Sequence, residues 1–130
     1  MSPKEPQTIL VIDDENMMSE MLARYLKREG FEGLIASNSE EGLSVLRRTK
    51  VDTVLLDIKL GDEDGFEVLK SIKKENPAIP VVMLTGLGYD DKAMSEALEL
   101  GASGYLSKSA DISEVGITVR RVLATASKST

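Results

Sequence analysis

The sequence predicts an α/β fold in which a parallel sheet of five strands is covered by helices on both faces. Short apolar runs alternate with longer segments of helical periodicity along the chain, and this alternation implies right-handed crossovers between parallel strands. The first, third and fourth runs are continuously apolar, as in strands that are buried on both sides. At 130 residues, the chain is expected to form one domain around a single substantial core.

The first half of the chain is predicted to supply two strands and two helices. Residues 9–12 are the first apolar run. The helix that follows extends to Gly30 and carries six apolar side chains at helical spacing, namely Met17, Met18, Met21, Leu22, Tyr25 and Leu26. Its three methionines are expected to fill the core. Residues 31–36 form the second strand, and Ser39 is expected to cap a second helix whose first turn is acidic.

The second half is predicted to contain three more strands and three more helices. In order, these are a strand at 51–57, a loop at 61–65, a helix from 66 to about 76, a strand at 81–85, a helix at about 90–100, a short strand at 104–107 and a last helix after 111. Pro77 and Gly101 mark the ends of two of these helices. Asp111 and Glu114 have the spacing of a capping box, which predicts the start of the last helix.

The composition excludes several kinds of chemistry. The chain has no cysteine, so it can form no disulfide or thiolate metal site, and it has no histidine, the commonest general base. Its net charge of −6 disfavours direct binding of nucleic acid. No apolar run is long enough to span a membrane, and the N-terminus does not resemble a signal peptide. We therefore expect a cytoplasmic domain of residues 7–125, with flexible ends at 1–6 and 126–130.

Polar or charged residues stand at the carboxyl ends of four predicted strands. Asp13 and Asp14 follow the first strand, Asp57 ends the third, Thr85 ends the fourth and Lys108 follows the fifth. Ligands of open parallel sheets bind beyond the carboxyl ends of the strands, so these groups are expected to form one site. Three carboxylates there favour a hard divalent cation, with Mg²⁺ as the default. The hydroxyl and the ammonium suit phosphate oxygens.

Four pieces of the sequence carry a family resemblance: VIDDE, LLDIKLGDEDG, VVMLTG and GASGYLSK. They resemble, in order and spacing, the receiver domain of bacterial two-component response regulators. The resemblance covers residues 7 to about 125. It implies a flavodoxin-like (βα)5 sandwich whose five-stranded parallel sheet has the order 2-1-3-4-5.

The resemblance also implies the chemistry of the site. Asp57 would be the phosphoacceptor and would receive a phosphoryl group from a partner sensor histidine kinase or phosphotransfer protein. Mg²⁺ would be held by Asp13, Asp14, Asp57 and the backbone carbonyl of Lys59. The absence of histidine agrees with this, because the donor histidine would belong to the partner.

The other implied roles concern signalling. Lys108 would pair with a phosphoryl oxygen, and Thr85 and Tyr105 would be switch residues that move on phosphorylation. The domain would then act on a downstream output protein or domain, with a homodimer through the fourth helix, fifth strand and fifth helix as one arrangement. It would be no enzyme in the usual sense, although it would assist its own phosphotransfer and dephosphorylation.

Several positions depart from the family pattern. Gly61 and Ser109 stand where the family usually has proline, the second of them cis. Because a cis bond before a non-proline residue costs about 2.5–4 kcal/mol, we expect a trans Lys108–Ser109 bond and a different path for the loop. Leu87 cannot orient an attacking water by a hydrogen bond, which favours a long-lived phosphoryl group.

Other interpretations remain open at this point. Asp14 alone could be a helix cap, Asp57 alone could begin a loop, and Lys108 alone could be solvated. The whole domain could be a degenerate receiver that acts as a phosphorylation-independent interaction module. A phosphatase is disfavoured because Lys59 replaces its usual second acid, and an FMN site is disfavoured because the acidic DDE segment would repel phosphate. No output module is expected after the last helix, so the domain could be free-standing or part of a longer protein.

Overall fold

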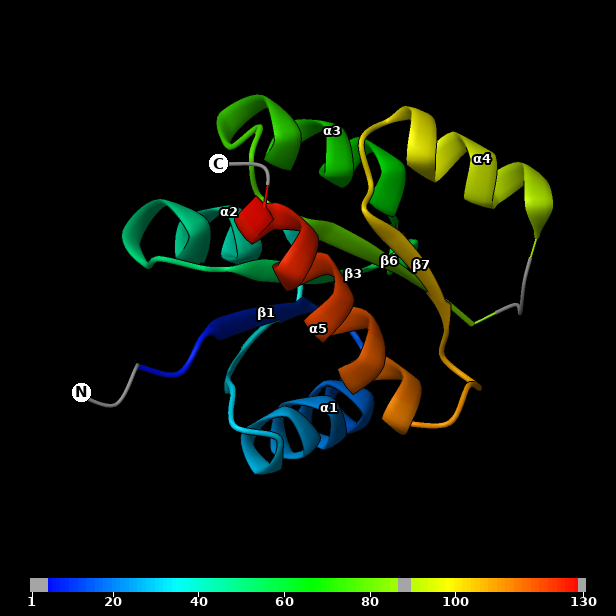
Figure 1. Ribbon diagram of the computed structural model, residues 1–130. Coiled ribbons are helices and arrows are strands. Elements are labelled where there is room, and N and C mark those ends of the chain that lie inside the picture. Colours follow the sequence, from blue (N-terminus) through cyan, green and yellow to red (C-terminus); the bar gives the residue numbers. More distant parts are fainter. Residues whose placement is uncertain (1–4, 87–89, 129–130) are drawn as a thin grey trace.

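The computed structural model describes residues 5–86 and 90–128, and its centre is a parallel sheet of five strands in the order β2-β1-β3-β6-β7 (Figure 1). The strands are β1 (Thr8–Ile12), β2 (Glu32–Ala36), β3 (Thr53–Asp57), β6 (Val81–Thr85) and β7 (Gly104–Ser107). The labels also count two short strands outside this sheet, so the order of the five is the predicted 2-1-3-4-5. The predicted α/β sandwich is confirmed.

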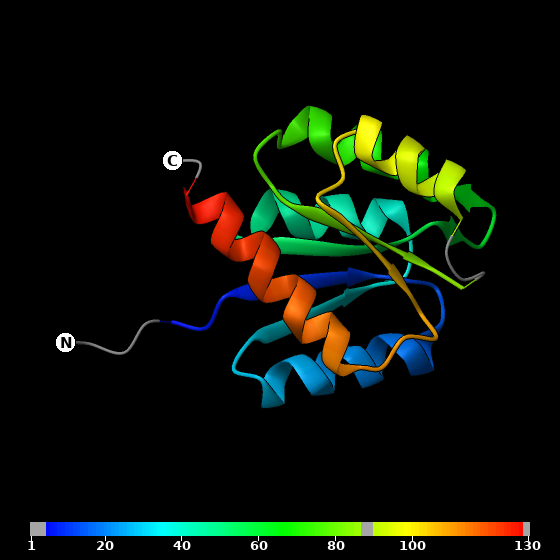
Figure 2. The ribbon, with the colours of Figure 1, turned by 45° about the vertical axis from the view of Figure 1, so that its right-hand side comes forward.

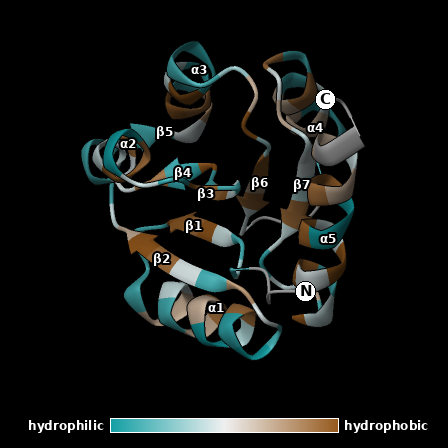
Figure 3. Cartoon of the chain, turned by 60° about the vertical axis from the view of Figure 1, so that its left-hand side comes forward, coloured by the Kyte–Doolittle hydropathy of each residue, from teal (hydrophilic) through white to brown (hydrophobic). Residues whose placement is uncertain are grey.

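Five helices cover the two faces of the sheet among the described residues. They are α1 (Asn16–Arg28), α2 (Ser39–Arg48), α3 (Gly65–Glu75), α4 (Asp91–Glu99) and α5 (Ser113–Lys128). Helices α1 and α5 pack on one face and α2, α3 and α4 on the other (Figure 2). Alternate strand residues enter the two cores, since Leu10 and Ile12 face α2 and α3 whereas Ile9 and Val11 face α1 and α5. Figure 3 shows the resulting hydrophobic strands between partly hydrophilic helices.

Helix α1 buries a narrower face than its apolar residues suggest. Met17 is 86% exposed and Met21 is 45% exposed, so the prediction that all three methionines fill the core is wrong; only Met18 packs against it. Met17 and Met21 are four residues apart and form an outer stripe. Leu22 and Leu26 form the inner stripe and are buried against the sheet.

The helix ends are fixed by local hydrogen bonds. Asn38, not Ser39 as predicted, caps α2 by accepting a hydrogen bond from Glu41 N at 2.9 Å. Asp64 caps α3 and Asp90 caps α4 in the same manner. Helix α5 continues to Lys128, three residues into the segment expected to be a C-terminal tail.

A short antiparallel pair follows β3, formed by β4 (Lys59–Leu60) and β5 (Glu63–Asp64), and β5 lies within the loop predicted at 61–65. Gly61 lies in the turn with a φ of +57°, which proline could not adopt because its ring holds φ near −65°. Glu63 accepts hydrogen bonds from both the backbone N and the hydroxyl of Ser39, which ties this pair to the start of α2. The glycine and this tie together shape the loop beside Asp57.

Candidate functional site

Four strand ends bring the predicted site residues to one edge of the sheet. Asp57 pairs with Leu84 in the register of β3 and β6, and Thr85 pairs with Ser107 in the register of β6 and β7. Asp13 follows β1 directly. The pocket at this edge has a volume of about 390 Å³ and is lined by Asp14, Glu15, Asp57, Ile58, Lys59, Gly61, Thr85, Gly86 and Lys108. The predicted convergence of groups is therefore present.

Three carboxylates at this edge are close enough to share a cation. Asp13, Asp14 and Asp57 each offer one oxygen, and these oxygens lie within 4.8 Å of one another. Asp13 is fully buried, and its Oδ2 accepts no well-aligned hydrogen bond within the described part of the chain, although the Lys108 ammonium lies 2.9 Å away. A buried, incompletely satisfied carboxylate oxygen beside two others is a donor set that fits a hard cation such as Mg²⁺.

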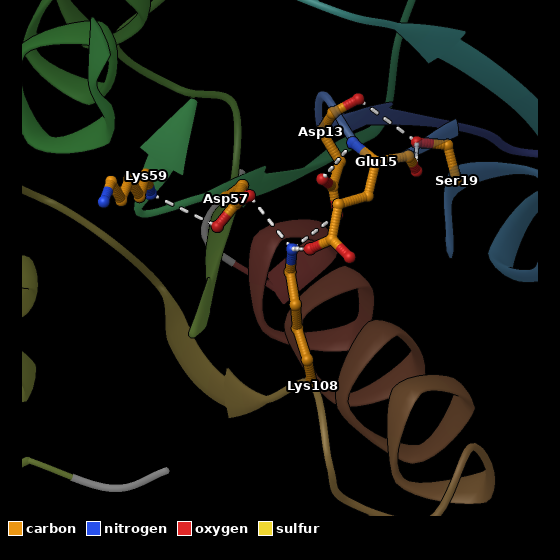
Figure 4. A network of polar contacts seen from close by, with 6 residues as sticks. All are labelled: Asp13, Glu15, Ser19, Asp57, Lys59 and Lys108. Carbon is orange, nitrogen blue, oxygen red and sulfur yellow. Dashed lines mark hydrogen bonds and ion pairs between the residues drawn. The ribbon is translucent and has the colours of Figure 1, made fainter. Parts of the chain in front are cut away.

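Lys108 lies at the centre of the charge network (Figure 4). Its Nζ is 2.9 Å from Asp13 Oδ2, 2.9 Å from Asp57 Oδ2 and 2.6 Å from Glu15 Oε1. The lysine side chain is only 9% exposed, so this ammonium offsets the buried carboxylates from within the protein.

Backbone hydrogen bonds hold the buried carboxylates in place. Asp13 Oδ1 accepts from Glu15 N at 2.9 Å, and Asp57 Oδ1 accepts from Lys59 N at 3.2 Å. The hydroxyl of Ser19, itself buried in α1, donates to the backbone oxygen of Asp13 at 3.2 Å. The carboxylates are thus oriented by the chain before any ligand arrives.

For both Asp57 and Lys108, burial and the neighbouring groups shift the pKa in opposite directions. Burial raises the pKa of Asp57 to about 6, although Lys108 and the Lys59 backbone N–H favour the charged form. For Lys108, burial lowers the pKa, but the bonds to Glu15, Asp13 and Asp57 outweigh it and the pKa is raised above its ordinary value. The site therefore holds a permanent ammonium beside a carboxyl that ionises near neutral pH.

The family of the chain follows from its sequence together with this geometry. Residues 9–120 match the family model of the response regulator receiver domain. The chain belongs to this family. The predicted recognition is confirmed, and so is the predicted class of function, a phosphoacceptor signalling switch of two-component systems. The phosphorylation-independent alternative is not favoured. Receiver domains are not classical enzymes, and they typically bind Mg²⁺ at an acidic pocket such as the one formed by these three aspartates.

Similar proteins agree with this assignment. The receiver is 34% identical over 119 residues to the probable transcriptional regulatory protein TcrX of Mycobacterium tuberculosis, covering 92% of this chain and 50% of the relative. It is 38% identical over 120 residues to the transcriptional regulatory protein ZraR of Klebsiella oxytoca, covering 92% of this chain and 27% of the relative. The chain thus spans half or less of the length of these relatives.

Solved structures show the same fold. A CheY-like receiver domain protein from Methanospirillum hungatei has a TM-score of 0.89 and 27% identity, with 96% of this chain and 99% of that chain covered. The receiver domain of NtrX from Brucella abortus has a TM-score of 0.85 and 32% identity, with 90% and 98% covered. In the described part of this receiver, no helix has the length and apolar character needed to cross a bilayer.

The structure places the remaining predicted residues as follows. Thr85 is buried and lines the pocket, and Lys59 lies at its rim. Tyr105 is half-buried and packs against the core under α2, α3 and α4, outside the pocket lining, so its switch role stays a prediction. Leu87 lies outside the described residues. The described residues contain no cis peptide bond, so the Lys108–Ser109 bond is trans as predicted.

Two functional neighbours were not foreseen from the sequence. Glu15 is the N-cap residue of α1, so Asp14 is not the helix cap, and the side chain of Glu15 reaches Lys108 instead of capping. Ser19 supports Asp13. The position of Glu15 directly after the acidic pair suggests a place near the site. Its contact with Lys108 could not be predicted, because the two residues are 93 positions apart in the sequence.

Because the pKa of Asp57 is raised, the difference in stability between wild type and Asp57→Asn should depend on pH. The folded state holds the proton more tightly than the unfolded chain, so folding becomes less favourable as the pH rises from 3.8 through about 6. Asp57→Asn removes this penalty. In metal-free buffer, the free energy of unfolding of the variant relative to wild type should rise between pH 4.5 and 7 by roughly 1–3 kcal/mol.

Urea unfolding at several pH values, with EDTA present, measures this difference. Asp62→Asn, at an exposed position of the neighbouring turn, is the matched control and should show little pH-dependent change relative to wild type. A difference for Asp57→Asn that stays constant or narrows with rising pH would contradict the prediction.

Proposed function

We propose that Asp57 is the phosphoacceptor and receives its phosphoryl group from a phosphohistidine of a sensor histidine kinase or phosphotransfer protein. One observation carries the proposal: Asp57, Asp14 and Lys108 line one pocket, and the buried Asp13 offers an oxygen within 4.8 Å of those of Asp14 and Asp57. Asp13 and Asp57 are buried, yet Asp57 still lines the pocket, where a donor group can reach it. This combination suits acceptance of a group from another protein.

The carboxylates account for the proposed metal site. Asp13, Asp14 and Asp57, together with the backbone carbonyl of Lys59, would hold Mg²⁺. When bound, the ion offsets negative charge on the transferring phosphoryl group. The incompletely satisfied Asp13 Oδ2 supports this assignment, because a cation would complete its interactions.

Asp57 and Lys108 have separate roles in the proposed phosphoryl transfer. An oxygen of Asp57 attacks phosphorus while the P–N bond of the phosphohistidine breaks, and the bonding electron pair remains on the imidazole nitrogen. Lys108, already 2.9 Å from Asp57 Oδ2, pairs with a phosphoryl oxygen. The same groups would assist dephosphorylation, in which water attacks the phosphorus, the bond from phosphorus to the Asp57 oxygen breaks, and inorganic phosphate leaves while the carboxylate is restored.

The proposed output follows from movement of Thr85 and Tyr105. The Thr85 hydroxyl turns toward the phosphoryl group and draws the end of β6 with it, and Tyr105 moves inward. This changes the surface of α4, β7 and α5, where an output protein or domain, or a second copy of the chain, would bind. We propose that these partners are proteins of the cytoplasm. The net charge of −6 disfavours direct contact with nucleic acid or with an anionic membrane surface.

Acetyl phosphate with Mg²⁺, followed by intact-protein mass spectrometry, tests the acceptor. Wild type should gain the mass of one phosphoryl group, Asp57→Ala should gain none, and Asp62→Ala, an exposed neighbour, should behave as wild type. An unmodified wild type, or modification that persists in Asp57→Ala, would refute the assignment.

A further inference from the structure

We propose that the carboxylate of Glu15 is a displaceable partner of Lys108 that must leave before Lys108 can bind a phosphoryl oxygen. Glu15 extends from the start of α1 across the pocket edge to the ammonium (Figure 4). This inference deepens the proposed function and rests on it, because it concerns phosphoryl transfer to Asp57. Glu15 would be a positioning residue that acts through Lys108.

The ammonium of Lys108 is closely surrounded by its present partners. An ammonium has three N–H donors. Three carboxylate oxygens lie around Nζ: those of Asp13 and Asp57 at 2.9 Å each and that of Glu15 at 2.6 Å. The contacts to Glu15 and Asp57 are hydrogen bonds, and the Asp13 oxygen lies beside the ammonium as an ion-pair partner. A phosphoryl oxygen can approach Nζ as closely only when one of these oxygens moves away.

The three partners differ in how readily they can be released. The side chains of Asp13 and Asp57 are 0% and 7% exposed, so either would lose its cation in a buried place. The side chain of Glu15 is 62% exposed and makes no capping hydrogen bond in the described structure. Water can replace Lys108 as the partner of Glu15, so the ion pair between Glu15 and Lys108 is the one that is released most readily.

Two consequences for the unmodified state follow from this contact. The Glu15 carboxylate occupies a contact position on Nζ that a phosphoryl oxygen could otherwise take. It also adds a negative charge at the pocket edge, where an anionic donor approaches. Glu15 therefore opposes phosphoryl binding, and shortening or neutralising its side chain should favour it.

Beryllofluoride, a noncovalent mimic of the phosphoryl group, tests the inference at saturating Mg²⁺. Calorimetric titration of Glu15→Gln should show affinity raised by roughly two- to tenfold relative to wild type. The initial rate of phosphorylation by acetyl phosphate should rise in the same direction. Glu20→Gln, an exposed position on the same helix with the same charge change, is the matched control and should match wild type in both measurements.

Glu15→Asp separates the contact from the charge. Aspartate keeps the negative charge but is one methylene too short to keep the 2.6 Å contact, so its affinity for beryllofluoride should also rise. An aspartate variant that binds as wild type, or a glutamine variant with equal or weaker affinity, would overturn the inference. If wild type itself neither binds beryllofluoride nor becomes phosphorylated, the proposed function fails as well.

Discussion

Lys108→Met should lower the free energy of unfolding by about 3 kcal/mol or more at neutral pH in metal-free buffer. The substitution keeps most of the side-chain volume but removes the ammonium that lies 2.9 Å from both Asp13 and Asp57. Asp13 is fully buried and Asp57 nearly so, and neither would have another cation beside it within the described residues. Urea unfolding in EDTA measures the loss.

Two further measurements test whether the loss of stability comes from the missing positive charge of Lys108. The loss should shrink as the pH falls toward about 6, the raised pKa of Asp57, because a protonated carboxyl no longer needs a counter-charge. Adding Mg²⁺ should restore more stability to Lys108→Met than to wild type, since a cation at the three aspartates would replace the missing positive charge.

The matched control is Lys70→Met on the surface of α3. Lys70 pairs with Glu67 at 2.8 Å, but these side chains are 52% and 67% exposed, so this change should stay within about 1 kcal/mol. If Lys108→Met unfolds at the same urea concentration as wild type, the ammonium does not stabilise the acidic pocket in the way described above.

Gly65→Ala should destabilise the domain by about 3 kcal/mol or more and also impair phosphorylation. A Cβ at Gly65 would lie 2.3 Å from the backbone oxygen of Asp57 and 2.5 Å from that of Ile58. Gly65 N also donates to Ile58 O at 2.6 Å, so the start of α3 lies directly against the acceptor segment. Backbone atoms cannot rotate aside as a side chain does, and the helix or Asp57 must move.

The intrinsic helical preference of alanine over glycine, about 1 kcal/mol, is too small to offset this overlap. Because displacement of Asp57 misaligns the attacking oxygen, the rate of phosphorylation by acetyl phosphate should fall by roughly tenfold or more. Gly86→Ala is the control for stability, since a Cβ at Gly86 would meet no atom of the described residues within 4 Å apart from its chain neighbours. Equal urea midpoints for Gly65→Ala and Gly86→Ala would show that the close approach has no energetic consequence.

Much of the fold was predictable because burial leaves a regular pattern in the sequence. Residues 81–85 are continuously apolar up to Thr85 and form the strand β6 with the predicted bounds. The convergence of Asp13, Asp57 and Lys108 was also predictable, since parallel strands end at the same edge of a sheet. These inferences need only the order of the elements and their direction.

Other features depended on side-chain directions that periodicity does not specify. Met17 and Met21 fit a helical pattern, yet the sheet contacts the neighbouring stripe of α1 and leaves them exposed. The short pair β4–β5 depends on a positive φ at Gly61 and on the contact of Glu63 with Ser39, 24 residues away. Such contacts form only after the helices are in place.

The sequence by itself determined the family, the parallel sheet and the set of acidic and basic groups at its carboxyl edge, because these follow from hydrophobic period and motif spacing. Only the tertiary structure decided that the Lys108 ammonium lies within 2.9 Å of carboxylate oxygens of Asp13, Asp57 and Glu15 together, and that Gly65 touches the acceptor segment. The physical reason is that hydrogen bonds and van der Waals contacts change within tenths of an ångström, and packing between distant segments sets such distances.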